Sequence, residues 1–265
     1  MKILVVREPW RLDPLAWIHR AEARAIAREL QAPLVEYAGV LPPGRALLRL
    51  SDAFMRQVIA GLDAPYCGPG REALERCYDK HEAHRVVITG GVHAPETYLA
   101  DSARTPEAPY VLKPRRGSDS IGVRIASTIP EAKRTADYLV QSRILGREVT
   151  VALYRDVAGV PLEIFVPRGK PYSFLQKYLL RPGRAPLPDE TLRDTARRVG
   201  RLLGVDWAAR VDFIVADDGR AFFLECDAAP LVGPDSAFAA SFAAAGVDRR
   251  QQLEWLVSAS RPPEG

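Results

Sequence analysis

The residues best suited to chemistry lie in one predicted hairpin, ARVDFIVADDGRAFFLECDAAP. Asp218-Gly219 predicts a two-residue turn, because both residue types accept the positive φ that a type I′ turn requires. Counting outward from this turn places Asp212 opposite Glu225 and Arg210 opposite Asp227, with all four side chains on one face. The other face is expected to be buried and carries Val211, Phe213, Val215, Phe222, Leu224 and Cys226.

Directly opposed carboxylates point to a cation. Like charges about 5 Å apart across two strands destabilise the pair. Asp212 facing Glu225 is therefore unfavourable unless a cation lies between them. Oxygen ligands of this kind are what Mg²⁺ requires, with Mn²⁺ as an alternative. A solvated polar face whose acids happen to align is the other interpretation.

A glycine-bearing turn forms a second candidate site, in the segment KPRRGSDSIG. Gly117, Ser118 and Ser120 allow a tight turn whose N–H groups can point at an anion, and Lys113 adds a positive charge. Many such turns bind nothing, so the segment by itself leaves both interpretations open.

Alternating helical and strand patterns predict the elements that hold these residues. The predicted strands cover residues 2–6, 108–114, 121–125, 148–154, 210–216 and 220–226. The predicted helices cover residues 18–30, 51–59, 79–91, 130–140 and 189–203. We expect a short α/β domain at 1–78, a central unit at 79–145 and a carboxyl-terminal unit at 146–265. No glycine-rich loop follows the first strand, which argues against a dinucleotide-binding domain.

Composition excludes several classes of protein. The 265 residues are 47% hydrophobic and 26% charged, which is typical of a globular chain and excludes disorder as the main state. The net charge of +4 and the lack of a basic stripe argue against nucleic-acid binding, and no apolar run reaches the ~20 residues that span a membrane. Three cysteines without metal-ligand spacing indicate reduced thiols, so we expect a cytoplasmic protein.

The ordered set of these motifs resembles the ATP-grasp superfamily and, within it, the D-alanine–D-alanine ligases. The set comprises Asp79-Lys80, Lys113-Pro114 with its Gly/Ser turn, Gly146-Arg147-Glu148, Lys177-Tyr178, the segment ARVDF and the segment LECDAAP. The resemblance covers about residues 60–265. It implies an α/β (α+β) ATP-grasp fold with ATP between the central and carboxyl-terminal lobes.

The resemblance also implies roles for individual residues. The expected ATP-binding residues are Lys80, Lys113, Gly117, Ser118, Ser120, Gln141, Arg143, Ile144 and Glu148. The expected Mg²⁺ ligands are Asp212, Glu225 and Asp227, and the expected catalytic residues are Arg210, Lys177 and Tyr178. Ser236 matches a serine that binds the carboxylate of the acceptor amino acid, although a helix N-cap is an equal interpretation.

The sequence also departs from the family pattern. Residues 1–60 contain neither the His-Gly…Gly-Glu-Asp-Gly segment nor the glutamate that orients the first D-alanine. Leu231 replaces a glycine, Gln141 replaces the commoner glutamate, and Asp227 replaces an asparagine. His81 and His84 have a spacing that could serve a metal, but no third ligand is evident, and we expect both on the surface.

The expected activity is that of an ATP-dependent carboxylate–amine ligase. A substrate carboxylate attacks the γ-phosphate, and an amine then displaces phosphate from the acyl phosphate, so no protein nucleophile is needed. The expected partners are small carboxylate and amine substrates and a second copy of the chain, with no nucleic acid and no membrane. Ring closure within one substrate and a nucleotide-binding module without turnover are the two alternatives.

Overall fold

The amino-terminal layer is a parallel sheet covered by helices. The computed structural model describes residues 2–167, 183–258 and 261. The first sheet has the order β2-β1-β3-β4 and comprises β1 (Ile3–Arg7), β2 (Leu34–Glu36), β3 (Arg45–Arg49) and β4 (Tyr66–Cys67). Its helices are α1 (Pro14–Glu29), α2 (Asp52–Ala60) and α3 (Arg71–Tyr78). Asp13 begins α1, because its carboxylate accepts a hydrogen bond from the Leu15 N–H at 3.0 Å.

The central layer is a small antiparallel sheet with the order β5-β8-β6-β7. Its strands are β5 (Thr97–Leu99), β6 (Tyr110–Pro114), β7 (Arg124–Ala126) and β8 (Tyr138–Gln141). Helix α4 (Lys80–Thr89) precedes it and has Gly90 as its C-cap, within two residues of the predicted end at residue 91. The predicted helix at 130–140 is wrong: one 3₁₀ turn, Glu131–Lys133, is followed by β8. Pairing of β8 with both β5 and β6 overrides the local helical pattern.

The carboxyl-terminal layer is a larger antiparallel sheet with the order β12-β11-β9-β13-β14, and β10 pairs with β9. Its strands are β9 (Gly146–Tyr154), β10 (Val157–Ala158), β11 (Leu162–Ile164), β12 (Arg184–Pro186), β13 (Ala208–Ala216) and β14 (Ala221–Asp227). Its helices are α5 (Glu190–Leu203), α6 (Ala237–Ala244) and α7 (Arg249–Ser258). The proline-rich composition of residues 182–188 predicts a break in secondary structure, but residues 184–186 form β12.

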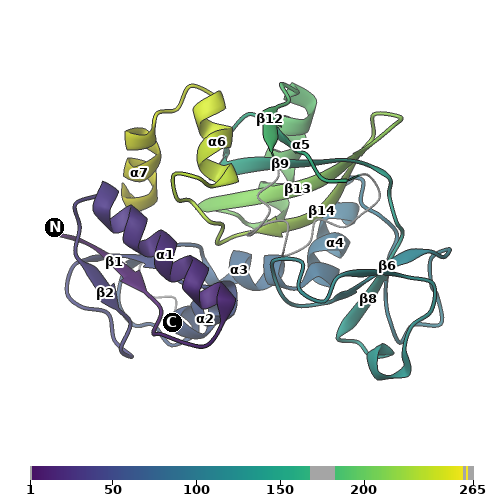
Figure 1. Ribbon diagram of the computed structural model, residues 1–265, viewed down its shortest axis with the longest axis horizontal. Helices are drawn as coiled ribbons and strands as arrows, with labels where there is room; N and C mark the ends of the chain where they lie inside the picture. Colours follow the sequence, from purple (N-terminus) through teal and green to yellow (C-terminus); the bar gives the residue numbers. More distant parts are fainter. Residues whose placement is uncertain (1, 168–182, 259–260, 262–265) are drawn as a thin grey trace.

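One hydrophobic core links the first and third layers. Met55 of α2 and Leu74 of α3 belong to the same buried cluster as Val151 of β9 and Val211 of β13. Figure 1 shows α3 between the amino-terminal sheet and the carboxyl-terminal sheet, and α4 between the carboxyl-terminal sheet and the central sheet at the lower right. The division into units at 78 and 145 stays a prediction. None of the described helices is both long and apolar enough to cross a membrane.

Candidate active site

The β13–β14 hairpin has the predicted residue pairs at the end away from its turn, but its turn and its register near the turn differ from the prediction. Arg210 pairs with Asp227 and Asp212 with Glu225, as predicted. The prediction of a two-residue turn is wrong. Ala216 donates to the Arg220 carbonyl, so the turn contains three residues, and Gly219 among them has a φ of +84°. A bulge beside Phe213 then restores the register.

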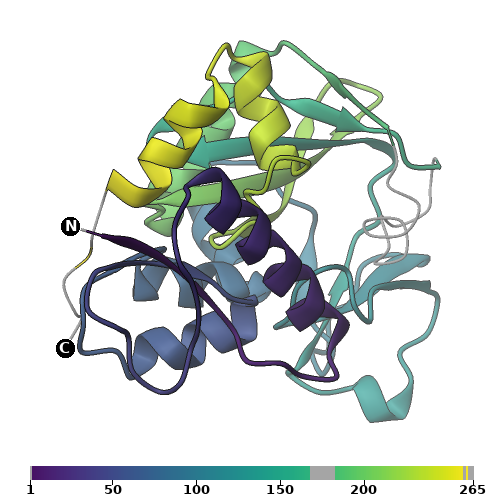
Figure 2. The ribbon, with the colours of Figure 1, turned by 60° about the vertical axis from the view of Figure 1, so that its left-hand side comes forward.

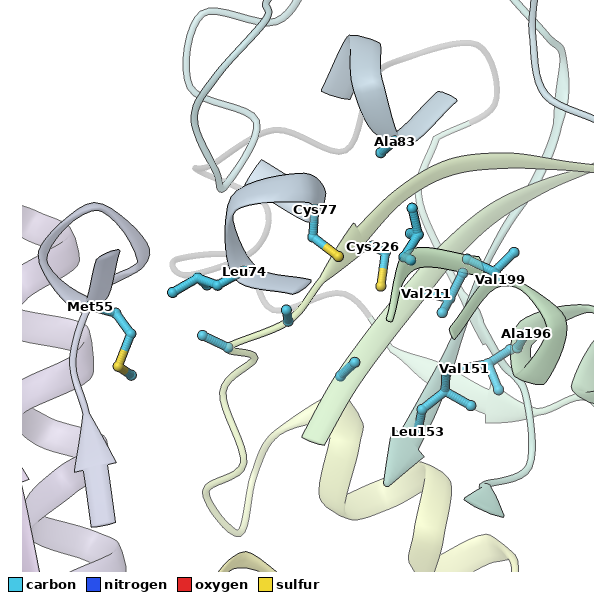
Figure 3. Packing of buried hydrophobic residues seen from close by; sticks show 14 of the residues in the cluster. Met55, Leu74, Cys77, Ala83, Val151, Leu153, Ala196, Val199, Val211 and Cys226 are labelled. Atoms are coloured by element: carbon cyan, nitrogen blue, oxygen red, sulfur yellow. The ribbon is translucent and has the colours of Figure 1, made fainter. Parts of the chain in front are cut away.

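The bulge changes which side chains of β14 are buried. Phe223 is fully buried in the core, whereas Phe222 is only half-buried, so the predicted burial of Phe222 is wrong. Leu224, also expected in the core, lines a pocket instead. Cys226 is buried as predicted and points toward Cys77 of α3 in Figure 3.

The first pocket lies between the central sheet and the carboxyl-terminal sheet. It is lined by all nine residues expected to bind ATP: Lys80, Lys113, Gly117, Ser118, Ser120, Gln141, Arg143, Ile144 and Glu148. Asp212 and Glu225 also line it. Its apolar walls include Val111, Val123, Ile125, Ile214 and Leu224. Apolar walls beside a few polar groups and lysines suit a planar base attached to a polyanion.

A buried network fixes one wall of the first pocket. The Lys113 ammonium donates to the Gln141 side-chain oxygen at 3.0 Å, and the Gln141 amide donates to Thr97 at 2.9 Å. The His84 ring nitrogen Nε2 lies 2.8 Å from the Leu224 carbonyl oxygen, next to the bulge. The predicted surface position of His84 is wrong: the ring is buried and lies 5.2 Å, between centroids, from the Phe223 ring of β14.

Burial changes the protonation of two members of this network. Burial, and then the nearby Lys80 charge, lower the pKa of Lys113 to about 8. Burial, and then Lys113, lower the pKa of His84 to about 3, so the ring is neutral. Lys113 therefore lies in a site that lacks a full negative counter-charge, which a phosphate would supply.

The glycine turn lies against the start of α4. The Lys80 ammonium donates to the Gly117 carbonyl, and the Lys80 N–H donates to the Arg115 carbonyl at 3.0 Å. Asp79 caps α4 and accepts from Arg115 at 2.9 Å. Gly117 has a φ of +134°, which only glycine adopts readily, so the predicted tight turn is confirmed.

A second pocket adjoins the first and shares Lys80, Gly117, Ser118 and Glu225 with it. Its lining adds Arg210 and Asp227 from the hairpin, Asp119 from the glycine turn and Asp52 from α2. Four acidic side chains face two basic ones in this lining. The second pocket is therefore suited to bind cations.

Arg210 neutralises two of the hairpin acids. Its guanidinium lies 3.0 Å from an Asp212 oxygen and 3.8 Å from an Asp227 oxygen. Burial disfavours its charge, but Asp212 and Asp227 outweigh that effect and raise the pKa of Arg210. Burial raises the pKa of Asp227 to about 6 even with Arg210 nearby. Glu225 lies 3.7 Å from the Lys80 ammonium.

The donor set fits a divalent metal, although the acids are not gathered around one point. Over the described part of the chain, no three His, Cys, Asp or Glu side chains lie close enough together to bind a metal ion as they stand. Asp212 and Glu225 are paired across the strands beside the first pocket, and Asp227 is two pairs further along. A typical protein Mg²⁺ site has only one or two carboxylate ligands, and water and phosphate oxygens complete the coordination of the ion.

One predicted residue, Ser236, has a different role in the described structure. The Ser236 hydroxyl accepts from the Ala239 N–H at 3.0 Å and begins α6, so the N-cap interpretation is confirmed. Ser236 is absent from the lining of both pockets. Lys177 and Tyr178 lie outside the described residues.

Sequence reasoning missed two acids of the second pocket. Asp52 follows the N-cap Ser51 of α2, and burial, then Asp227 and Asp119, raise its pKa well above the usual value. An acidic residue in the first turn of a helix is too common to signal a site. Asp119 has a positive φ of +58°, and its place within the predicted glycine turn was the available signal.

Comparisons with known proteins agree with this geometry. A family model described as the D-ala D-ala ligase C-terminus matches residues 86–258. The D-alanine–D-alanine ligase of Syntrophotalea carbinolica is 33% identical over 220 residues, which cover 74% of this chain and 70% of that protein.

Solved structures share the fold at lower identity. The D-alanine–D-alanine ligase of Bacillus anthracis complexed with ATP aligns with a TM-score of 0.74 at 16% identity, covering 97% of this chain and 96% of that one. The VanG D-Ala:D-Ser ligase of Enterococcus faecalis aligns with a TM-score of 0.75 at 16% identity, covering 97% and 98%. The chain has the ATP-grasp fold and belongs to the D-alanine–D-alanine ligase family of ATP-dependent carboxylate–amine ligases.

Proposed function

We propose that the protein joins two amino acids through an acyl phosphate, with a D-amino acid such as D-alanine as the first candidate for each position. The observation that carries this proposal is the continuity of the two pockets through Lys80 and Glu225. Nucleotide phosphates in the first pocket would thereby end beside Arg210 in the second pocket. The names of the relatives support D-alanine as a substrate.

The nucleotide would lie with its base against the apolar wall of the first pocket. Gln141 and Ile144 would face the base and Glu148 the ribose, while Lys80, Lys113 and the turn residues Ser118 and Ser120 would hold the phosphates. The Gln141 oxygen already accepts from Lys113, so it would serve the base with its remaining lone pair.

The reaction would then depend on positioning and on charge. The donor carboxylate attacks the γ-phosphorus and ADP leaves; the acceptor amine then attacks the acyl carbon, loses a proton, and inorganic phosphate leaves. Arg210 would stabilise the oxyanion of the tetrahedral intermediate, and its raised pKa keeps it cationic. Lys177 and Tyr178, which match a Lys-Tyr pair of the family, would lie near the reaction centre.

The metal would be Mg²⁺, held by Asp212, Glu225 and Asp227. Bound there, it would neutralise phosphate charge that Lys80 and Lys113 do not cover. The excess of acids in the second pocket supports this assignment. A homodimer, a cytoplasmic location and the lack of nucleic-acid or membrane partners stay predictions.

A screen of amino-acid pairs tests the proposed function. ADP release is measured with ATP and Mg²⁺ over a panel of D- and L-amino acids, and the product is weighed by mass spectrometry. We expect amino-acid-dependent ADP release and a linear dipeptide, both lost in Asp212→Ala and Glu225→Ala. Asp218→Asn is the matched control, since Asp218 is exposed in the turn of the same hairpin and contacts Arg220.

Three outcomes would contradict the proposal. A product one water lighter than a single substrate would indicate ring closure. ATP binding without ADP release over the whole panel would indicate a nucleotide-binding module. Full activity in Asp212→Ala and Glu225→Ala would remove the metal assignment.

A further inference from the structure

Charged side chains from the amino-terminal layer bind the backbone of the loop that follows β14. The fully buried Arg49, at the end of β3, donates to the Pro230 carbonyl at 2.6 Å. Glu22 of α1 accepts from the Val232 N–H and, at 2.7 Å, from the Gly233 N–H. Arg49 and Glu22 are themselves paired at 2.6 Å. Figure 2 shows α1 running beside the yellow-green segments that follow β14.

Burying the Arg49–Glu22 ion pair costs free energy, and the contact between the two side chains does not by itself account for the pair being there. Removing two charges from water carries a large desolvation penalty, which apolar residues of similar volume would avoid. Both oxygens of Glu22 are engaged, one by Arg49 and the other by the two loop N–H groups. Arg49 and Glu22 therefore act together on backbone positions 181 to 211 residues away in the sequence.

A third charged residue, from the carboxyl-terminal layer, also binds this loop. Arg249 of α7 donates to the Val232 carbonyl at 2.8 Å and pairs with Glu29 of α1 at 2.6 Å. Gly233 packs so closely that a Cβ there would lie 3.2 Å from the Glu22 side chain. The N–H groups of the loop thus bind Glu22 of α1, and its C=O groups bind two arginines that are each paired with a glutamate of α1.

The loop joins the second pocket to α6. Ala228, which lines the second pocket, lies two residues before Pro230, and Asp227 accepts from the Ala229 N–H at 2.9 Å. Three residues beyond Gly233, Ser236 begins α6. A shift of Pro230–Gly233 would consequently move the wall of the second pocket without moving the first.

We propose that Glu22 and Arg49 are positioning residues for the amino-acid end of the active site. They set the place of residues 230–233 and so the affinity for the amino-acid substrates, while ATP binding is independent of them. This inference rests on the proposed function. The amino-terminal layer would thus affect substrate binding indirectly, by fixing the backbone of the loop at residues 230–233.

The test combines kinetics with amide hydrogen exchange. Glu22→Leu with Arg49→Met removes both charges at similar volume, an exchange that buried ion pairs often tolerate. We expect KM for the amino acids to rise by about tenfold or more, with the ATP dissociation constant changed by less than about twofold. The amides of Val232 and Gly233 should exchange about tenfold or more faster.

A second ion pair that also involves a residue of α1 provides the control. Arg20 of α1 bonds Glu36 of β2 at 2.8 Å and also donates to the Glu8 carbonyl, both of them in the amino-terminal layer. Arg20→Met with Glu36→Leu should leave KM for the amino acids and exchange at 232 and 233 unchanged. Glu22→Gln is the milder second variant, which keeps an acceptor for the loop amides and should shift the same quantities in the same direction by less.

The possible results separate this inference from the proposed function. Unchanged amino-acid KM and unchanged exchange in a folded double variant would overturn the positioning role. An equal loss of ATP affinity would indicate a merely structural pair and would overturn it as well. If the double variant fails to fold, Glu22→Gln decides the question by the same two measurements. If the wild-type protein lacks ligase turnover, the proposed function fails, and exchange at 232 and 233 still tests the contact.

Discussion

The two pockets differ in how many layers of the chain build them. The first pocket is lined by α4 together with the central and carboxyl-terminal sheets, and local sequence motifs predict most of its polar residues. The second pocket adds Asp52 of α2 and Leu74 of α3 to the hairpin acids. Short local motifs therefore supply most polar residues of the first pocket, whereas the lining of the second pocket depends also on how the amino-terminal layer packs.

Charge separates the two pockets as well. The first pocket balances Lys80, Lys113 and Arg143 against Glu148, Asp212 and Glu225. The second pocket has four acids and two bases, and burial raises the pKa of two of those acids, Asp52 and Asp227. Because the charged residues of the two pockets differ, we expect some substitutions to impair ATP binding in the first pocket and others to impair catalysis in the second. The following substitutions test this.

Arg210→Met should give the largest effect, and it should act on the second pocket alone. Loss of a group that stabilises a developing oxyanion typically lowers kcat by about 10²–10³-fold. The ATP dissociation constant should stay within about twofold, because Arg210 does not line the first pocket. Single-turnover kinetics and ATP titration check this, with thermal unfolding to verify folding. Equal losses in both quantities would contradict the separation of the pockets.

Lys113→Met should give an intermediate effect, confined to the first pocket. A charge-assisted hydrogen bond contributes about 1.5–3 kcal/mol, so ATP affinity should fall by roughly 10–100-fold. Because the pKa of Lys113 is lowered to about 8, the ammonium form is lost as pH rises through that value. Wild-type ATP affinity should accordingly be constant below pH 8 and fall above it.

Two variants isolate this pH dependence. Lys113→Arg stays charged over the whole range and Lys113→Met is never charged, so ATP affinity in both should be flat between pH 7 and pH 9, a window chosen about the pKa near 8. Isothermal titration over this range measures the effect. An unchanged slope in Lys113→Met would assign the titration to another group.

His84→Gln should give the smallest effect, on the strand that both pockets share. The folded pKa of about 3 lies below the usual 6.5, so protonation favours the unfolded chain. The stability that the neutral ring contributes is present above pH 6.5 and is lost as pH falls toward 3, by up to about 1.4 kcal/mol per pH unit.

Urea unfolding at several pH values measures this contribution. His84→Gln should show a shallower loss of stability below pH 6.5 than the wild-type protein. His93→Gln is the control, because His93 is exposed. Parallel curves for the wild-type protein and His84→Gln would contradict the buried neutral state of the ring.

The hairpin shows how far local rules reach. The predicted pairing of Asp212 with Glu225 is confirmed, although the turn has three residues and a bulge follows. The longer turn shifts the register by one residue and the bulge shifts it back. Local turn preferences do not encode the bulge, which coincides with the contact between His84 and the Leu224 carbonyl, a residue pair 140 positions apart. The burial of Phe223 in place of Phe222 follows from it.

The sequence alone determined the residue types that make the chemistry and the periodicities that form most helices and strands, because both are local properties. Tertiary structure decided that residues 138–141 form a strand, since their partners β5 and β6 are distant in the chain. It also decided that Asp52 reaches the second pocket and that Glu22 and Arg49 hold residues 230–233. Contacts between layers are set by packing over the whole core, and no short segment of the chain encodes them.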